Sequence, residues 1–243
     1  MIGDTLPEGG IGGLQRQRPV FILALDASLS RCSAAVQGEG RLLAQRLRDG
    51  DRGHASALPP MAAAVLAEAG LRAADLDAVA AVVGPGGFTG LRAALALAHG
   101  IALGAGLPVI GVTTGEALRA ALAPEERAGG RAVWTAVDAR RGRVALERFA
   151  PQGAAASTPP EVFAEDGLPP APGRVAVAGD AAEAVAARLA ARGVDALLSA
   201  VRLPDAAAAA RVAALRLAGR LPPLPARPLY AEPPAVRPPP VEA

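Results

Sequence analysis

The chain has 243 residues, 51% of them apolar, and its 25 basic residues nearly balance 23 Asp and Glu residues, giving a formal net charge of +2. This length allows a sizeable core in one large domain or two smaller ones, and the near balance of charge gives no strong reason to expect autonomous nucleic-acid binding. The single cysteine, Cys32, excludes an intramolecular disulfide framework, and no apolar stretch approaches the roughly 18–20 uninterrupted residues of a membrane span, so we expect a cytoplasmic protein without membrane contact.

Residues 1–18 change from acidic to glycine-rich to basic and lack the apolar core of a signal peptide, so we expect a disordered leader. The remaining chain divides into a first half at 19–122, a second half at 131–220 and a proline-rich tail at 221–243. The proline spacing of the tail predicts an extended segment that packs along a surface or is partly disordered.

The first half begins with a three-stranded meander and continues with helices and strands in alternation. In chain order, the predicted elements are strands at 20–30, 31–38 and 41–48, a helix at 55–70, a strand at 76–84, a helix at 88–104, a strand at 107–112 and a helix at 114–122. This order is typical of a ribonuclease-H-like α/β unit, the building block of actin-like sugar-kinase and chaperone ATPases.

The second half starts again with two predicted strands and a tight turn. Its predicted elements are strands at 131–139 and 143–150, a Pro/Ala-rich loop, a strand at 173–180, a helix at 181–193, a short apolar stretch at 194–200 and a helix around 205–219. Asp26 and Asp138 each end the first strand of a half, which suggests two pseudo-repeated halves. We therefore predict an α/β protein with the actin-like ATPase fold, built from two ribonuclease-H-like halves of which the second is trimmed and degenerate.

A glycine-rich turn follows the strand at 76–84 in the sequence VVGPGGFTGLRAALALAHGIALG. It fits neither the Walker A nor the GxGxxG pattern, and the chain has no lysine to complete a P-loop. Two interpretations remain open. The turn provides tight strand-to-helix packing with Phe88 plugging the core, or it contacts an anion at a helix N-terminus. The residues that would make the anion contact, with Thr89 also able to cap the helix, are Gly84, Gly86, Gly87, Thr89 and Arg92.

The turns after the two equivalent strands resemble the phosphate turns of actin-like ATPases but lack their glycines. Asp26 is followed by Ala27 and Ser28, and Asp138 is followed by alanine and then by Arg140 and a second arginine. Bulky side chains at these positions would obstruct the usual nucleotide seat. For Asp26, a structural role as a capping residue explains the pattern at least as well as a role as a metal ligand does. Asp26, Ser28, Asp138 and Arg140 are thus candidate nucleotide contacts in a site poorly suited to Mg-ATP hydrolysis.

Other catalytic constellations are missing from the sequence. The two histidines, His54 and His99, form no HxE or HxxxH pair, and no CxxC or GxSxG motif occurs. We therefore predict neither a metal site nor a catalytic residue.

Several stretches together resemble the TsaB (YeaZ-type) family, from about Val20 into the tail. The motif Gly-Pro-Gly-x-Phe-Thr-Gly-Leu-Arg is the most specific of them, and FILALDASLSRCSAAV, HASALPPMAAAVLAEAGL, AVDARRGRVALERF, VAVAGD and PLYAEPPAV support it. The resemblance implies an actin-like ATPase fold with a degenerate active site and a non-catalytic role. It also implies support of TsaD, the paralogue that transfers threonylcarbamoyl to adenosine 37 of tRNA.

The resemblance further implies a TsaD-like transferase subunit and a TsaE-like ATPase as partners, a TsaC-type protein that makes the threonylcarbamoyl-adenylate, and tRNA contact only through the complex. In the family, the helices predicted at 55–70 and 88–104 form the interface with TsaD, or with a second TsaB copy when TsaD is absent. No intrinsic cofactor is implied, and any ATP or ADP would be shared at that interface. The residues expected to contribute to the core or to this interface are His54, Leu58, Met61, Val65, Leu91, Leu95 and Ala98.

Two other functional hypotheses belong to different classes. An actin-like ATPase or kinase would use Asp26 and Asp138 around Mg-nucleotide, and the missing glycines argue against it. A peptidase is suggested only by the grouping of the family with glycoprotease-like proteins, and the sequence offers no matching nucleophile or metal ligands.

Overall fold

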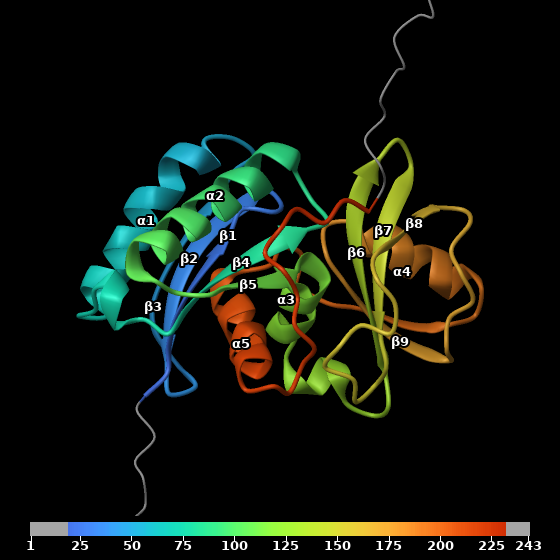
Figure 1. Ribbon diagram of the computed structural model, residues 1–243. Helices are drawn as coiled ribbons and strands as arrows, with labels where there is room; N and C mark the ends of the chain where they lie inside the picture. The colour runs from blue at the N-terminus through green and yellow to red at the C-terminus, as the bar shows by residue number, and fades with distance from the viewer. Residues whose placement is uncertain (1–18, 232–243) are drawn as a thin grey trace, which may run out of the picture.

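The computed structural model describes residues 19–231, which form two five-stranded mixed sheets with helices packed on them (Figure 1). The predicted leader at 1–18 and the last part of the predicted tail, 232–243, lie outside the described residues. The first half contains β1 (Phe21–Asp26), β2 (Arg31–Gly38), β3 (Arg41–Asp49), α1 (His54–Glu68), β4 (Ala78–Gly84), α2 (Phe88–Ala105), β5 (Val109–Thr113) and α3 (Thr114–Ala121). The second half contains β6 (Ala132–Arg140), β7 (Arg143–Phe149), β8 (Glu161–Ala164), β9 (Arg174–Ala178), α4 (Ala182–Ala191), β10 (Asp195–Leu198) and α5 (Ala206–Leu217).

The two sheets have equivalent strand orders, β3-β2-β1-β4-β5 and β8-β7-β6-β9-β10. In each sheet the first strand pairs antiparallel with the second and parallel with the fourth. The second half contains no helix between its third and fourth strands, where the first half has α1. The prediction of two ribonuclease-H-like halves with a trimmed second half is therefore confirmed. Strand β8 lies in the stretch that the sequence predicted to be a loop.

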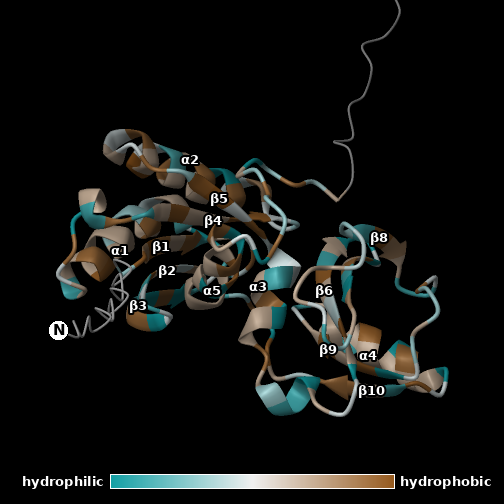
Figure 2. Ribbon diagram, turned by 60° about the horizontal axis from the view of Figure 1, so that its bottom comes forward, coloured by the Kyte–Doolittle hydropathy of each residue, from teal (hydrophilic) through white to brown (hydrophobic). Residues whose placement is uncertain are grey.

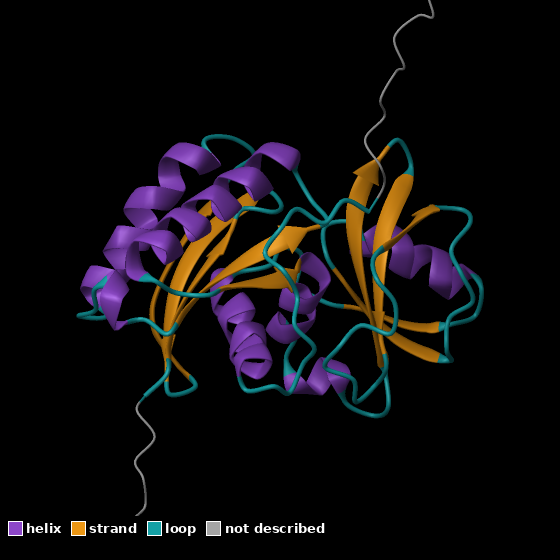
Figure 3. Ribbon diagram, in the orientation of Figure 1, coloured by secondary structure: helices purple, strands orange, loops and turns teal. Residues whose placement is uncertain are grey.

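The first sheet is covered on both faces, by α1 and α2 on one side and by α3 and α5 on the other (Figure 3). All seven residues of β4 are buried, as expected for a parallel strand between two helical layers. Figure 2 shows α1, α2 and the strands beneath them mainly in brown, consistent with an apolar layer under both helices. By length and composition α2 could also cross a membrane, but five of its residues are buried in the core: Leu91, Ala94, Leu95, Ala98 and Ala102.

Helix α5 lies against the first sheet, although the sequence assigned it to the second half at 131–220. Its alanines pack on apolar residues of β1, β2 and β4, and the Ser33 hydroxyl accepts a hydrogen bond from the Ala206 N–H (2.9 Å). The small alanine side chains allow the helix to approach the sheet closely. Sequence periodicity predicts the helix but does not indicate on which of the two sheets it packs. The predicted range 131–220 thus includes a helix that packs on the first sheet.

A buried ion pair joins α5 to α3. Arg216 donates to both carboxylate oxygens of Glu116 (2.6 and 3.0 Å), and both side chains are almost fully buried. The same guanidinium donates to the carbonyl oxygens of Gly111 in β5 and Pro222 after α5. One side chain thus holds two helices, a strand and the start of the C-terminal segment together.

Arg216→Met should lower the free energy of unfolding by about 3–5 kcal/mol, because it leaves the Glu116 carboxylate buried without its charge partner. The double variant Glu116→Gln/Arg216→Met should recover part of that loss. Urea unfolding followed by circular dichroism measures both effects. Equal stability of Arg216→Met and the wild type would contradict this assignment.

Glu147 of β7 lies beside this ion pair, where α3 meets the second sheet, and is only 2% exposed. Burial, and secondarily the charge of Glu116, raises its pKa from 4.5 to about 8. The unfolded chain therefore ionises Glu147 at lower pH than the folded protein does. Folding stability should decrease as the pH rises from about 4.5 to about 8.

We expect Glu147→Gln to reduce this pH dependence, since an amide does not ionise. Thermal unfolding at pH 6 and pH 9 should show a smaller fall in melting temperature for Glu147→Gln than for the wild type. The same fall in both proteins would show that Glu147 is not the responsible group.

Candidate functional site

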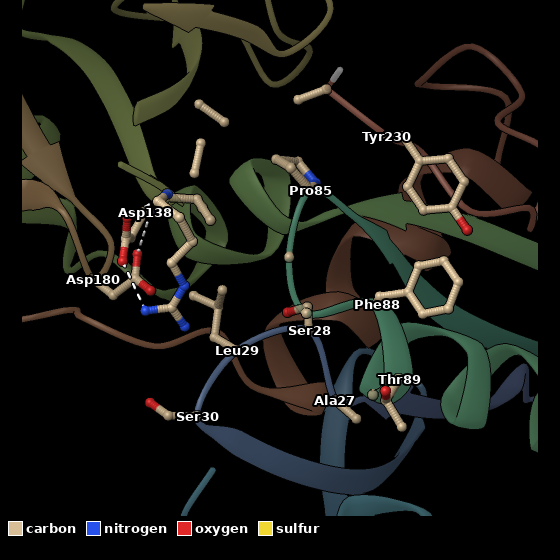
Figure 4. A pocket seen from close by; sticks show the side chains of 18 of the residues that line it. Ala27, Ser28, Leu29, Ser30, Pro85, Phe88, Thr89, Asp138, Asp180 and Tyr230 are labelled. Carbon is tan, nitrogen blue, oxygen red and sulfur yellow. Dashed lines mark hydrogen bonds and ion pairs between the residues drawn. The ribbon is translucent and has the colours of Figure 1, made fainter. Parts of the chain in front are cut away.

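A cleft of about 800 Å³ separates the two halves (Figure 4). One side consists of the turn after β1 and the glycine-rich turn before α2, and the other consists of the end of β6 with Asp180. Residues 229–231 of the C-terminal segment complete the rim. Most of the turns that the sequence analysis identified as candidate sites, at the ends of β1, β4 and β6, therefore line this cleft.

The glycines of the turn before α2 are needed for contact between two loops. A Cβ atom at Gly86 would clash with the carbonyl oxygen of Ser28, and one at Gly90 would clash with that of Ala27. The Gly87 N–H donates to the Ser28 oxygen (2.7 Å), so one backbone donor of the turn is already used. These contacts support the interpretation of the turn as tight packing, and they leave anion binding without direct support.

Phe88 does not plug the core, contrary to one expectation from the sequence. Its side chain is 55% exposed and stacks on Tyr230, with 6.1 Å between ring centroids. The Arg92 guanidinium lies 3.7 Å from the Phe88 ring centroid and donates to the Tyr230 hydroxyl through Nε and Nη2. Thr89 is exposed in the first turn of α2, where Gly87 occupies the N-cap position, so Thr89 does not cap the helix.

Asp26 is buried and does not line the cleft. One carboxylate oxygen accepts a hydrogen bond from the Ser28 N–H (2.9 Å), which closes the turn after β1. Burial raises the Asp26 pKa from 3.8 to about 6. The second oxygen and the Ser28 hydroxyl are buried without a hydrogen-bond partner. This geometry fits the structural, turn-closing role of Asp26.

The Asp138 carboxylate is paired with an arginine of its own turn. It accepts hydrogen bonds from the Arg140 backbone N–H (2.7 Å) and from the Arg140 guanidinium (3.1 Å). Asp180, which follows β9, accepts from the Asp138 N–H (2.9 Å), and burial raises its pKa. Figure 4 shows the Asp138 and Asp180 carboxylates close together on one wall of the cleft. The sequence analysis missed Asp180, although it stands at the end of the strand predicted at 173–180.

Within residues 19–231, no group of three or more His, Cys, Asp or Glu side chains is placed to hold a metal ion. His54 is buried at the start of α1 and donates through Nε2 to the Gly50 oxygen (2.6 Å). His99 donates to the Ala226 oxygen (2.8 Å). Both histidines therefore have structural partners in the fold.

Most of the predicted partner-interface residues belong to the core. The buried ones are His54, Leu58, Val65, Leu91, Leu95 and Ala98, and Met61 is partly buried. Their helix faces meet the sheet, so they are unavailable to a partner that docks on the outside. The outward faces of α1 and α2 instead carry mainly small residues, among them Pro59, Ala63, Ala67, Ala96 and Gly100. The large side chain of Leu103 also lies on this face and is 86% exposed.

Two ribonuclease-H-like halves around a shared cleft define an α/β protein of the actin-like ATPase fold. The family described as TsaD, tRNA N6-adenosine threonylcarbamoyltransferase, matches residues 42–163, half of the chain. The chain belongs to this family, within its TsaB (YeaZ-type) group.

Three relatives show the extent of the similarity. The tRNA threonylcarbamoyladenosine biosynthesis protein TsaB of Escherichia coli is 37% identical over 123 residues, 51% of this chain and 52% of that protein. A tRNA N6-adenosine threonylcarbamoyltransferase of Maricaulis maris is 40% identical over 115 residues, 39% of this chain and 30% of that protein. The structure of YeaZ from Pseudomonas aeruginosa aligns with a TM-score of 0.71 at 27% identity, covering 87% of this chain and 99% of that one. The chain spans about half the length of the TsaB relative and less of the transferase.

Gly90→Ala should destabilise the protein by about 1–3 kcal/mol, because the added methyl group overpacks the contact with Ala27. Gly100→Ala is the matched control in the same helix, since a Cβ atom there meets nothing within 4 Å. It should stabilise the protein by up to about 1 kcal/mol, the helix propensity difference between glycine and alanine. Urea unfolding distinguishes the two, and a stabilising Gly90→Ala would contradict the loop packing described above.

Proposed function

We propose that this chain is a non-catalytic scaffold and activator subunit in the biosynthesis of threonylcarbamoyladenosine at position 37 of tRNA. In this role it supports a TsaD-like transferase subunit. The similarity to the TsaB protein of Escherichia coli, whose name places that protein in this biosynthesis, is the observation that carries the proposal.

The geometry of the cleft supports a non-catalytic role. Asp26 is enclosed in its turn, and Asp138 is already paired with Arg140. A hydrolytic actin-like enzyme needs accessible carboxylates and glycine turns to hold metal and phosphates. Both features argue against the alternative of an ATPase or kinase acting through Asp26 and Asp138.

The outward faces of α1 and α2 are the proposed docking surface for the TsaD-like subunit, and for a second copy of this chain when that subunit is absent. Small side chains allow another helix pair to approach closely. A TsaE-like ATPase would bind the assembled pair in the cytoplasm, and tRNA would be contacted through the complex. Any ATP or ADP would be shared at the interface between subunits.

Depletion of this protein should abolish threonylcarbamoyladenosine in bulk tRNA, and the wild-type gene should restore it. Mass spectrometry of tRNA nucleosides provides the measurement. The purified chain should show no transferase activity without a TsaD-like subunit. An unchanged modification level after complete depletion would exclude an essential role in this biosynthesis.

A further inference from the structure

The segment after α5 is an integrated part of the first half. Residues 221–231, here called the C-terminal strap, pass along β5 and reach the N-terminus of α2 (Figure 1). Gly111 donates to the Leu224 oxygen (2.9 Å), and Leu229 donates to the Val83 oxygen (2.8 Å). A Cβ atom added at Gly111 would lie 2.7 Å from the Pro225 oxygen, and one added at Gly84 would lie 2.5 Å from the Leu229 oxygen. Glycines in β4 and β5 therefore make room for the strap.

The strap carries the only tyrosine of the chain to a surface cluster formed by Phe88, Arg92 and Tyr230. Phe88 and Tyr230 are 55% and 42% exposed, although the chain has only four phenylalanines and one tryptophan besides this tyrosine. Their rings face each other beside the cleft (Figure 4). Two stacked, exposed aromatic rings with an arginine are typical of the residues that contribute most to protein–protein binding.

The charge of Arg92 is not neutralised inside the described part of the chain. Its Nε and Nη2 atoms donate to the neutral hydroxyl of Tyr230, and its guanidinium covers the Phe88 ring. No carboxylate among residues 19–231 forms an ion pair with it. The cluster thus presents a cation held by two contacts, with apolar rings beside it. This chemistry matches a carboxylate side chain of a partner, with the carboxylate on the Arg92 guanidinium and its methylene groups or an apolar neighbour on the aromatic rings.

We propose that Phe88, Arg92 and Tyr230 bind an aspartate or glutamate side chain of the subunit that docks on the outward face of α2. The cluster is continuous with that face, since Arg92 belongs to the same exposed side of α2 as Ala96 and His99. His99 also holds the strap through its bond to the Ala226 oxygen. The inference rests on the proposed function, and it makes the C-terminal strap a part of the interface.

Binding of the full-length chain to the TsaD-like subunit of the same organism tests the inference. Isothermal titration calorimetry at about 50 mM and about 500 mM NaCl separates screened charge pairs from other contacts. Arg92→Gln should weaken binding about tenfold at low salt, and the difference from wild type should shrink at high salt. Tyr230→Phe keeps the ring but releases Arg92, so a smaller loss is expected. Arg188→Gln, at an exposed position of α4, is the matched control and should bind like the wild type.

The outcomes separate the two proposals. If the wild-type chain does not bind the TsaD-like subunit, the proposed function fails and the subsite with it. If the wild type binds and Arg92→Gln binds equally well, only the subsite is overturned. A loss that is the same at both salt concentrations excludes a carboxylate partner. A loss that appears only with added ATP or ADP assigns the anion to a nucleotide phosphate and also overturns the proposal. Circular dichroism and thermal unfolding verify that each variant is folded.

Discussion

The buried ion pair between Glu116 and Arg216 is the contact on which the arrangement of the other elements depends. Removing two charges from water is costly, and the cost is offset here because the guanidinium also satisfies the carbonyl oxygens of Gly111 and Pro222. The pair holds α5 on the first sheet and directs the chain after α5 along β5. The strap and its tyrosine reach the cleft rim as a consequence.

In the cleft, the polar groups of the turns bond each other within the protein while the actin-like fold is retained. The turn after β1 packs directly on the glycine-rich turn before α2, so backbone groups of the two loops bond each other. In the second half, Asp138 and Arg140 neutralise each other within one turn. The polar groups of these turns thus stabilise the loops themselves, which supports the proposed scaffold role.

Prediction from the sequence succeeded where one local pattern decides the outcome and failed where two distant segments meet. The continuous apolar run of β4 and the helical spacing of apolar residues in α2 identified both elements. Such patterns extend over a few neighbouring residues and follow from the geometry of a strand or a helix. One of the two interpretations of the glycine-rich turn placed Phe88 in the core. The structure exposes Phe88 instead, because its partner Tyr230 lies 142 residues away in the sequence. The assignment of Leu58 and Leu95 to an interface or the core could not be decided from periodicity, because α1 and α2 are apolar on more than one side.

The sequence by itself determined the two pseudo-repeated halves, the strand-turn-helix units with Asp26 and Asp138 at equivalent ends, and the absence of lysine and of paired histidines. Only the tertiary structure decided that α5 crosses to the first sheet, that Asp180 joins Asp138, and that the strap brings Tyr230 to Phe88 and Arg92. The physical reason is the range of the interactions. Hydrophobic period and turn chemistry act over a few residues, whereas buried ion pairs, ring stacking and loop packing require the whole chain to be folded.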